Sequence, residues 1–148
     1  MNILFVCTGN TCRSPIAEAI LKARNLDNVV VRSAGIYAID GGEMSHYGQK
    51  VLENEGIPFA HNSTALKPSV IEWADIILTM TASHKQTIIH TFPQAISKVY
   101  MYKEFVEHKG MQDVSDPYGG SLRTYENTFQ ELSALTDELV KKLQGEMG

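Results

Sequence analysis

Residues 2–23 read NILFVCTGNTCRSPIAEAILKA, and this stretch decides the fold class. Its apolar start, NILFV at 2–6, is continuous rather than alternating, which is typical of a strand covered by helices on both faces. Its last part repeats apolar side chains at helical spacing, at Ile16, Ala17, Ile20 and Leu21. The stretch therefore predicts a buried strand, a tight polar loop and a helix, in that order.

The same alternation continues along the rest of the chain. Further apolar, β-rich runs lie at 29–34, 75–80 and 98–102, and further helical patterns lie at 46–55, at 83–91 and after 121. The segments 35–45 and 103–120 are rich in glycine and polar residues and are interpreted as loops. The pattern predicts an α/β fold, a single doubly wound domain spanning 1–148, with a four-stranded parallel sheet flanked by helices on both faces.

Two serines are candidate helix caps. Ser14 would cap the first helix, with Pro15 at the first helical position. Ser121 would cap the last helix, whose apolar stripe comprises Leu122, Tyr125, Phe129, Leu132, Leu135, Leu139 and Leu143. Such a stripe indicates a helix that faces the core rather than a functional surface.

The composition excludes several classes of partner. The 148 residues carry a net charge of -4 without any cluster of lysine and arginine, which argues against a nucleic-acid partner. No stretch approaches the roughly 20 apolar residues that a membrane span requires, so no membrane partner is expected. The start lacks the basic region and the cleavage site of a signal peptide, and we expect a cytoplasmic protein. We also expect a monomer.

Cys7 and Cys12 are the two cysteines of the chain, and they sit in one short loop. They are too close in sequence to link distant parts of a fold, and the reducing cytosol favours thiols, so we expect them to perform chemistry. The histidines lack metal-ligand spacing, and we expect no metal, no cofactor and ordinary surface or core roles for them. They are His46, His61, His84, His90 and His108.

The loop after the first strand has the geometry of a phosphate cradle. A strand, a tight polar loop and a helix N-terminus bring together the backbone amides from Thr8 to Arg13, which can bind an oxyanion. Gly9 is expected to adopt backbone angles closed to other residues. Asn10 is expected to tolerate a left-handed conformation or to tie the loop by side-chain hydrogen bonds. An ordinary strand-to-helix turn shares this local pattern, so the chemistry at the two ends of the loop decides.

Cys7 and Arg13 stand at those two ends. The amides, the helix dipole and the guanidinium all favour a thiolate at Cys7, which makes its sulfur a candidate nucleophile toward phosphorus. A planar, bidentate arginine can hold the equatorial phosphoryl oxygens while charge redistributes. Ser14 can cap the helix or hydrogen-bond the thiolate, and both roles stay open. An ATP-binding loop is disfavoured because the Gly-Lys-Ser/Thr sequence is missing.

The motif SDPYGG at 115–120 contains the best candidate acid. A phosphocysteine route needs an acid for the leaving group and later a base for water. Asp116 is followed by Pro117, which restricts its backbone, and by Tyr118, whose ring can wall a pocket. Taken alone, such an aspartate more often bonds its own backbone in a turn, but the Cys-x5-Arg loop favours the catalytic interpretation. Asp113 is the alternative acid.

The segments VCTGNTCRSPIAEA and DPYGG resemble the signature loop and the Asp-Pro acid loop of the low-molecular-weight protein-tyrosine-phosphatase family. Their order and separation agree with that family, so the resemblance spans essentially the whole chain. It implies a four-stranded parallel sheet and metal-free hydrolysis of a phosphorylated protein side chain. It also implies Cys7 as nucleophile, Arg13 as phosphate clamp, Asp116 as acid and then base, and Asn10 and Ser14 as organisers of the loop.

Thr11 is a departure from the tyrosine-specific pattern. Tyrosine phosphatases of the family usually carry a bulky aliphatic residue there, and the threonine resembles the bacterial protein-arginine phosphatases of the same fold. A guanidinium leaving group is planar, cationic and rich in donors, so the Thr11 hydroxyl and the Asp116 carboxylate suit it. A phenol gains from an aromatic wall, which Tyr118 still offers. We expect hydrolysis of phosphoarginine in protein partners, with phosphotyrosine as the alternative. The residues expected to contact substrate are Thr8, Gly9, Asn10, Thr11, Cys12, Ser14 and Tyr118.

A thiol oxidoreductase that resembles the arsenate reductases is the rival of another class. Those enzymes share the fold and the loop but need further cysteines to relay the disulfide, and none is present beyond Cys12. A catalytically idle phosphate-binding module would be favoured by the loss of Cys7, Arg13 or Asp116, and all three are present. Cys12 itself either fills space under the loop or traps an oxidised Cys7 as a disulfide.

Overall fold

Four parallel strands form one sheet in the computed structural model, which describes residues 1–57, 59–107 and 112–147. They are β1 (Asn2–Cys7), β2 (Val30–Gly35), β3 (Ile76–Thr79) and β4 (Val99–Met101), in the spatial order β2-β1-β3-β4. The chain runs outward from β1 to β2 and then crosses back to β3. The strand order therefore reverses between β1 and β3, where an open α/β sheet forms its binding crevice. The predicted fold class is confirmed.

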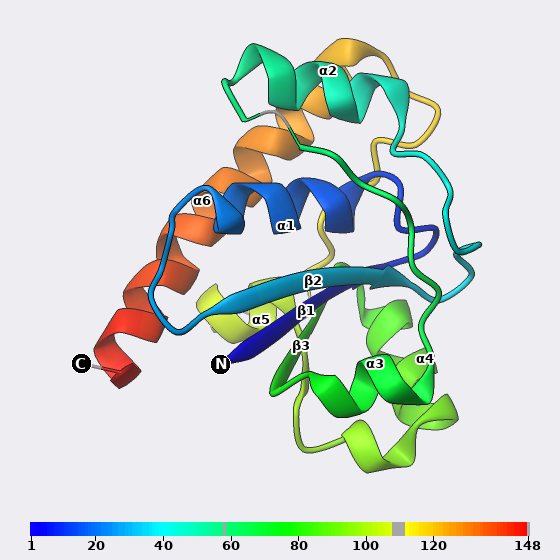
Figure 1. The fold of residues 1–148 in the computed structure, drawn as a ribbon, viewed down its shortest axis with the longest axis vertical. Coiled ribbons are helices and arrows are strands. Elements are labelled where there is room, and N and C mark those ends of the chain that lie inside the picture. Colours follow the sequence, from blue (N-terminus) through cyan, green and yellow to red (C-terminus); the bar gives the residue numbers. More distant parts are fainter. Residues whose placement is uncertain (58, 108–111, 148) are drawn as a thin grey trace.

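Helices cover both faces of the sheet (Figure 1). They are α1 (Arg13–Lys22), α2 (His46–Asn54), α3 (Pro68–Trp73), α4 (Ala82–Thr91), α5 (Tyr102–Glu107) and α6 (Leu122–Met147), with a 3-10 turn at Pro93–Ala95. In Figure 1, α1 and α6 lie on one side of the sheet, and α3 and α4 lie on the other. No helix in the described part of the chain has the length and apolar composition that crossing a bilayer requires.

The side chains of β1 explain why its sequence is apolar throughout. Ile3 and Phe5 belong to the core on the side of α1 and α6, whereas Leu4 and Val6 belong to the core on the side of α3 and α4. All four side chains are fully buried, because successive residues of a strand point to opposite faces. The strand thus carries the loop that follows it on a rigid base between two packed layers.

The last helix packs along α1, α2 and α5, as its apolar stripe predicts. Leu122, the first residue of the predicted stripe, is partly buried. The other six are buried, namely Tyr125, Phe129, Leu132, Leu135, Leu139 and Leu143. The Ser121 hydroxyl accepts a hydrogen bond from Thr124 N at 3.4 Å, which is the predicted cap. Helix α6 is therefore one of the main covers of the sheet.

Two short helices were not predicted from the sequence. Helix α5 begins at Tyr102, the last residue of the strand predicted at 98–102, and continues into 103–120, which was interpreted as a loop. That interpretation is wrong for the first part of the range. Residues 108–111 of the same range lie outside the described residues. Helix α3 was also missed. Each spans six residues, too few for a helical period to stand out, and their stability depends on buried side chains.

The predicted start of the first helix is wrong by two residues. Cys12, not Ser14, occupies the N-cap position, and it makes no side-chain capping bond. Ser14 lies inside the first turn and is fully buried. Its hydroxyl points to the sulfur of Cys7 instead of to a backbone amide. The Ser14 hydroxyl therefore contacts the Cys7 sulfur at the start of the preceding loop and does not cap the helix.

Candidate active site

A cavity of about 220 Å³ opens where the loop after β1 meets the segment before α6. Its lining residues are Cys7, Thr8, Gly9, Thr11, Cys12, Arg13, Asp116 and Tyr118. The structure thus brings both sequence motifs to one place, although they lie about a hundred residues apart in the chain. Asn10 and Ser14, which were also expected to contact substrate, are fully buried and lie outside this lining.

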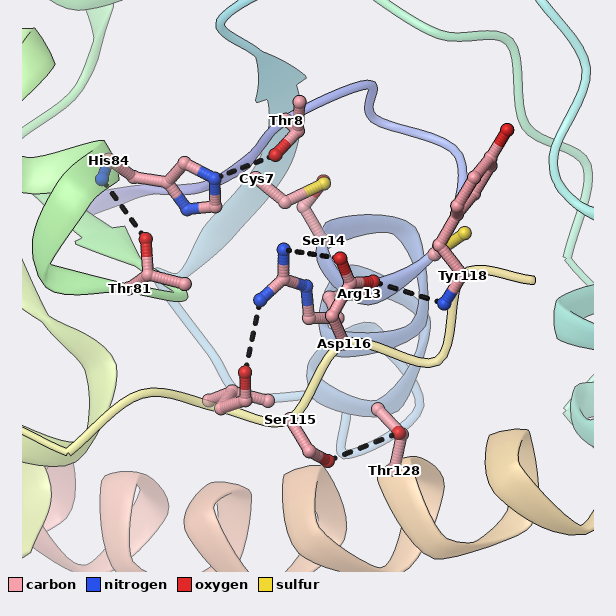
Figure 2. A network of polar contacts seen from close by, with 12 residues as sticks. Cys7, Thr8, Arg13, Ser14, Thr81, His84, Ser115, Asp116, Tyr118 and Thr128 are labelled. Carbon is pink, nitrogen blue, oxygen red and sulfur yellow. Dashed lines mark hydrogen bonds and ion pairs between the residues drawn. The ribbon is translucent and has the colours of Figure 1, made fainter. Parts of the chain in front are cut away.

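Cys7 is the last residue of β1, and its side chain is almost fully buried at the base of the cavity. Its sulfur lies 2.8 Å from Ser14 Oγ (Figure 2). The side-chain amide of Asn10 donates a hydrogen bond to the same Oγ at 2.8 Å, which leaves the serine hydrogen free to point at the sulfur. A hydrogen bond donated to sulfur stabilises negative charge on it. This arrangement suits a nucleophilic thiolate.

Asn10 holds the loop together from beneath. Its backbone is left-handed, with φ at 56°, as predicted. Its Nδ2 donates to Ser14 Oγ and to Ser33 Oγ, and its Oδ1 accepts from Thr64 N at 2.8 Å. All three neighbours belong to different parts of the chain, so one side chain fixes the loop relative to α1, β2 and the segment before α3.

The expectation for Gly9 is wrong, and the glycine that the loop requires is Gly35, for a different reason. The φ angle of Gly9 is not in the left-handed region, and a Cβ added to Gly9 would meet only the Thr11 hydroxyl, at 3.6 Å. Gly35 ends β2 directly beside Cys7. A Cβ at Gly35 would come within 2.7 Å of Asn10 N, closer than real Cβ atoms approach backbone. The loop therefore needs a glycine on the neighbouring strand.

Arg13 begins α1 and links the loop to the segment that carries Asp116. Its side chain is buried, and its Nη1 donates to the Val114 carbonyl at 3.0 Å. Its Nη2 lies 3.6 Å from Asp116 Oδ2, and Figure 2 shows the two side chains next to each other. The Asp116 side chain is half exposed, and its Oδ1 accepts from Tyr118 N at 3.0 Å. A carboxyl group and a guanidinium therefore face the same cavity as the sulfur.

The remaining lining residues differ in exposure. Tyr118 is 80% exposed at the mouth, so its ring is available to an incoming group. Cys12 is buried, and its sulfur lies 3.3 Å from the Tyr125 hydroxyl. Burial and this contact raise the pKa of Tyr125 to about 12, so its hydroxyl stays protonated. Both cysteines are free thiols, and the packing of Cys12 fits the space-filling role, while a disulfide with Cys7 stays a prediction.

Two histidines that were interpreted as ordinary residues contact the loop. His84, in the first turn of α4, lies with Nε2 2.9 Å from Thr8 Oγ1 (Figure 2). His61 Nε2 donates to the Asn10 carbonyl at 2.8 Å. Neither position is marked by a motif, because the contact depends on how distant segments pack. His108 lies outside the described residues.

The environment of His84 keeps its ring neutral. Burial, followed by repulsion from the nearby Arg13, lowers the pKa of His84 from 6.5 to about 4, despite attraction from Asp113 and Asp116. Asp113 itself lies outside the cavity lining, and its Oδ1 accepts from Ala82 N at the start of α4. The structure therefore does not favour Asp113 as the alternative acid.

Comparison with known proteins agrees with this geometry. A family model described as low molecular weight phosphotyrosine protein phosphatase matches residues 2–147. The chain belongs to this family. Within the low molecular weight phosphatases, it is 46% identical to a protein-arginine-phosphatase of Geobacillus stearothermophilus, over 97% of each chain. It is 39% identical to the protein-tyrosine-phosphatase PtpB of Staphylococcus haemolyticus, over 94% of this chain and 97% of the relative.

Solved structures of low molecular weight phosphatases show the same fold. The YwlE arginine phosphatase from Geobacillus stearothermophilus superposes with a TM-score of 0.96 at 46% identity, covering 98% of this chain and 94% of that one. A YwlE C7S mutant with a phosphorylated active-site serine superposes with a TM-score of 0.94 at 42% identity, covering 97% and 96%. In that protein, the residue that replaces the cysteine carries a phosphoryl group.

Proposed function

We propose that this protein is a cysteine-dependent phosphatase that hydrolyses phosphoarginine in proteins through a phosphocysteine intermediate. The observation that carries the proposal is the cavity in which the Cys7 sulfur, the Arg13 guanidinium and the Asp116 carboxyl group meet. The C7S relative with its phosphoserine supports phosphoryl transfer to position 7. Cytoplasmic location, a monomeric state and a single domain remain predictions.

The proposed reaction has two steps. In the first, Cys7 attacks phosphorus, the S–P bond forms and the P–N bond breaks, while Asp116 gives a proton to the departing guanidine nitrogen. The loop amides and Arg13 hold the phosphoryl oxygens as charge redistributes. In the second, Asp116 takes a proton from water, the water oxygen attacks phosphorus, the S–P bond breaks and phosphate leaves. The cysteine returns as a thiolate.

Thr11 and Asp116 support the preference for phosphoarginine. Both line the cavity and offer oxygen acceptors to a leaving group that carries several N–H donors. The 46% identity to a protein-arginine-phosphatase supports the same choice. Phosphotyrosine is the second candidate substrate, because the exposed Tyr118 ring offers an aromatic wall and PtpB is a named tyrosine phosphatase.

The proposal is tested by comparing kcat/KM on phosphoarginine and phosphotyrosine peptides of the same sequence context. We expect the wild type to prefer phosphoarginine. Thr11→Ile removes the hydroxyl and adds apolar surface, so it should shift the ratio toward phosphotyrosine by about tenfold or more. Thr91→Ile, at an exposed position outside the cavity, is the matched control. An unchanged ratio in Thr11→Ile would contradict the assigned basis of selectivity, and no turnover of either peptide would contradict the function.

A further inference from the structure

The peptide unit between Val114 and Ser115 is held at both of its polar groups. Its carbonyl oxygen accepts from Arg13 Nη1 at 3.0 Å, and its N–H donates to Glu131 Oε1 at 2.8 Å. One partner is a cation on α1 and the other is an anion on α6. Because a peptide is planar, fixing both groups fixes the direction in which the chain enters Ser115, the residue directly before Asp116.

Glu131 is itself oriented by further contacts. Its Oε1 also accepts from the Ser115 hydroxyl at 3.3 Å, and that hydroxyl lies 3.4 Å from Thr128 Oγ1 on the same helix (Figure 2). Its other oxygen lies 3.5 Å from Lys103 Nζ on α5. The Lys103 and Glu131 side chains are 14% and 29% exposed. One carboxylate oxygen of Glu131 therefore binds Ser115 in the segment 114–118 around Asp116, called the acid segment below, and the other lies near Lys103 on α5.

The rest of the acid segment has fewer anchors. Val114 N donates to the Met80 carbonyl just after β3, which holds the segment before the clamped peptide. After that peptide, Asp116 makes its contacts with Tyr118 N and, at 3.6 Å, with Arg13. Arg13 is also the residue proposed to bind phosphate, so its guanidinium serves both the ligand and this segment. Of the two side chains that hold the Val114–Ser115 peptide, Glu131 is the one that does not take part in the proposed phosphate binding.

We propose that Glu131 is a positioning residue for Asp116, which acts by clamping the Val114–Ser115 peptide against Arg13. The inference rests on the proposed function, because it concerns the acid of that reaction. Without the Glu131 carboxylate, the peptide is held at its carbonyl alone and turns about the Arg13 contact. Asp116 then meets the leaving group in the correct orientation for a smaller fraction of the time.

The test measures kcat/KM on aryl phosphates whose phenol leaving groups range from good to poor, because kcat/KM covers only the steps up to leaving-group departure. Glu131→Ala should lower kcat/KM about tenfold for the poorest leaving group and by less than about twofold for the best. Asp116→Asn gives the reference slope for complete loss of the acid. Glu131→Gln keeps an oxygen acceptor for Ser115 N and should stay within about threefold of the wild type.

Glu138→Ala is the matched control, because Glu138 lies on the same helix and pairs with the exposed Lys141, away from the acid segment. A similar thermal unfolding midpoint in all variants shows that they fold. An equal loss at every leaving group, or no loss in Glu131→Ala, would overturn the positioning role while leaving the function intact. A wild type that hydrolyses no phosphate compound would overturn both proposals.

Discussion

Ser14 links the loop to the nucleophile through a single oxygen. Its oxygen receives a hydrogen bond from Asn10 and lies within hydrogen-bond distance of the Cys7 sulfur. Both polar side chains are fully shielded from water, where hydrogen bonds act with greater electrostatic strength than at the surface. At this scale, the reactivity of the site depends on how neighbouring side chains hold one sulfur.

Cys7→Ser should abolish turnover and preserve binding of phosphate. A serine hydroxyl remains protonated at neutral pH and is a far weaker nucleophile, whereas the amides and Arg13 are unchanged. We expect kcat to fall by at least about a thousandfold. Inorganic phosphate binding, measured by calorimetry, should change little. Turnover at a rate near that of the wild type would contradict the assignment of the nucleophile.

His84 should make the folded protein less stable in mild acid. The unfolded chain takes up a proton at the ordinary histidine pKa of 6.5, whereas the folded chain does so only at about 4. The free energy of unfolding should therefore fall as the pH drops from 6.5 to 4, with a contribution of up to about 1.4 kcal/mol per pH unit. His84→Gln should remove this contribution.

Urea unfolding at several pH values in that window measures the effect. The glutamine amide in His84→Gln can still donate to the Thr8 hydroxyl, so the variant removes the titrating group with little loss of packing. His90→Gln is the control, since His90 is exposed on the same helix. An identical pH dependence for the wild type and His84→Gln would show that another group is responsible.

The site residues that could be predicted are those whose chemical role shows in a short stretch of sequence. Cys7 and Arg13 stand in one loop with a spacing that phosphate chemistry requires, and Asp116 lies in a recognisable turn. His84 and Gly35 could not be found in this way, because their contacts with the loop arise from α4 and from β2. No property of their own sequence neighbourhoods marks them.

The end of β2 is the element that sets the shape of the phosphate loop. Gly35 pairs with Cys7, and the loop backbone passes directly over its Cα. The strand β2 therefore contributes to the loop twice, through the missing side chain of Gly35 and through the Ser33 hydroxyl that accepts from Asn10. Helix α4, which is capped by Thr81, contributes to the loop through the side chain of His84, which contacts Thr8.

Gly35→Ala should displace the loop and weaken phosphate binding. The added methyl would lie 2.7 Å from Asn10 N and 2.8 Å from Gly9 C, so backbone must move. Such overpacking typically costs about 1–3 kcal/mol of folding stability. Denaturant unfolding and phosphate titration measure the two effects. Gly145→Ala on α6 is the control, because nothing lies within 4 Å of its added Cβ. Unaltered phosphate affinity in Gly35→Ala would argue against this role.

The length of a helix decided whether it could be predicted from the sequence. The four longer helices and all four strands were expected near their observed positions. Helix α5 buries Tyr102, Phe105 and Val106 at helical spacing, but six residues also fit a loop. Packing against α6 selects the helix, and packing is not visible in a short sequence window.

The sheet lies between two helical layers, and the site lies just beyond the carboxyl end of β1. The parallel sheet was predictable from its continuous apolar runs. The spatial order of the strands was not predictable, since similar apolar runs can be placed side by side in several different orders. That order places β1 at the centre and so places the phosphate loop at the reversal point.

Leu139→Ala should destabilise the whole fold and leave the chemistry intact. Leu139 is fully buried in the core between α6 and the sheet, so truncation should lower the free energy of unfolding by about 2–5 kcal/mol. Because Leu139 does not line the cavity, kcat/KM of the folded fraction should match the wild type. A large loss of kcat/KM under conditions where the variant is folded would show that the core and the site are coupled.

The contact between Arg13 and Val114 joins positions 101 residues apart. The strands β2, β3 and β4 all lie between these two positions in the chain. A break in any intervening surface loop would put the nucleophile and the acid on different fragments. Hydrolysis would then require the two pieces to find each other and dock. Split halves of this protein would accordingly behave as a complementation pair, whose recovered activity reports on their reassembly.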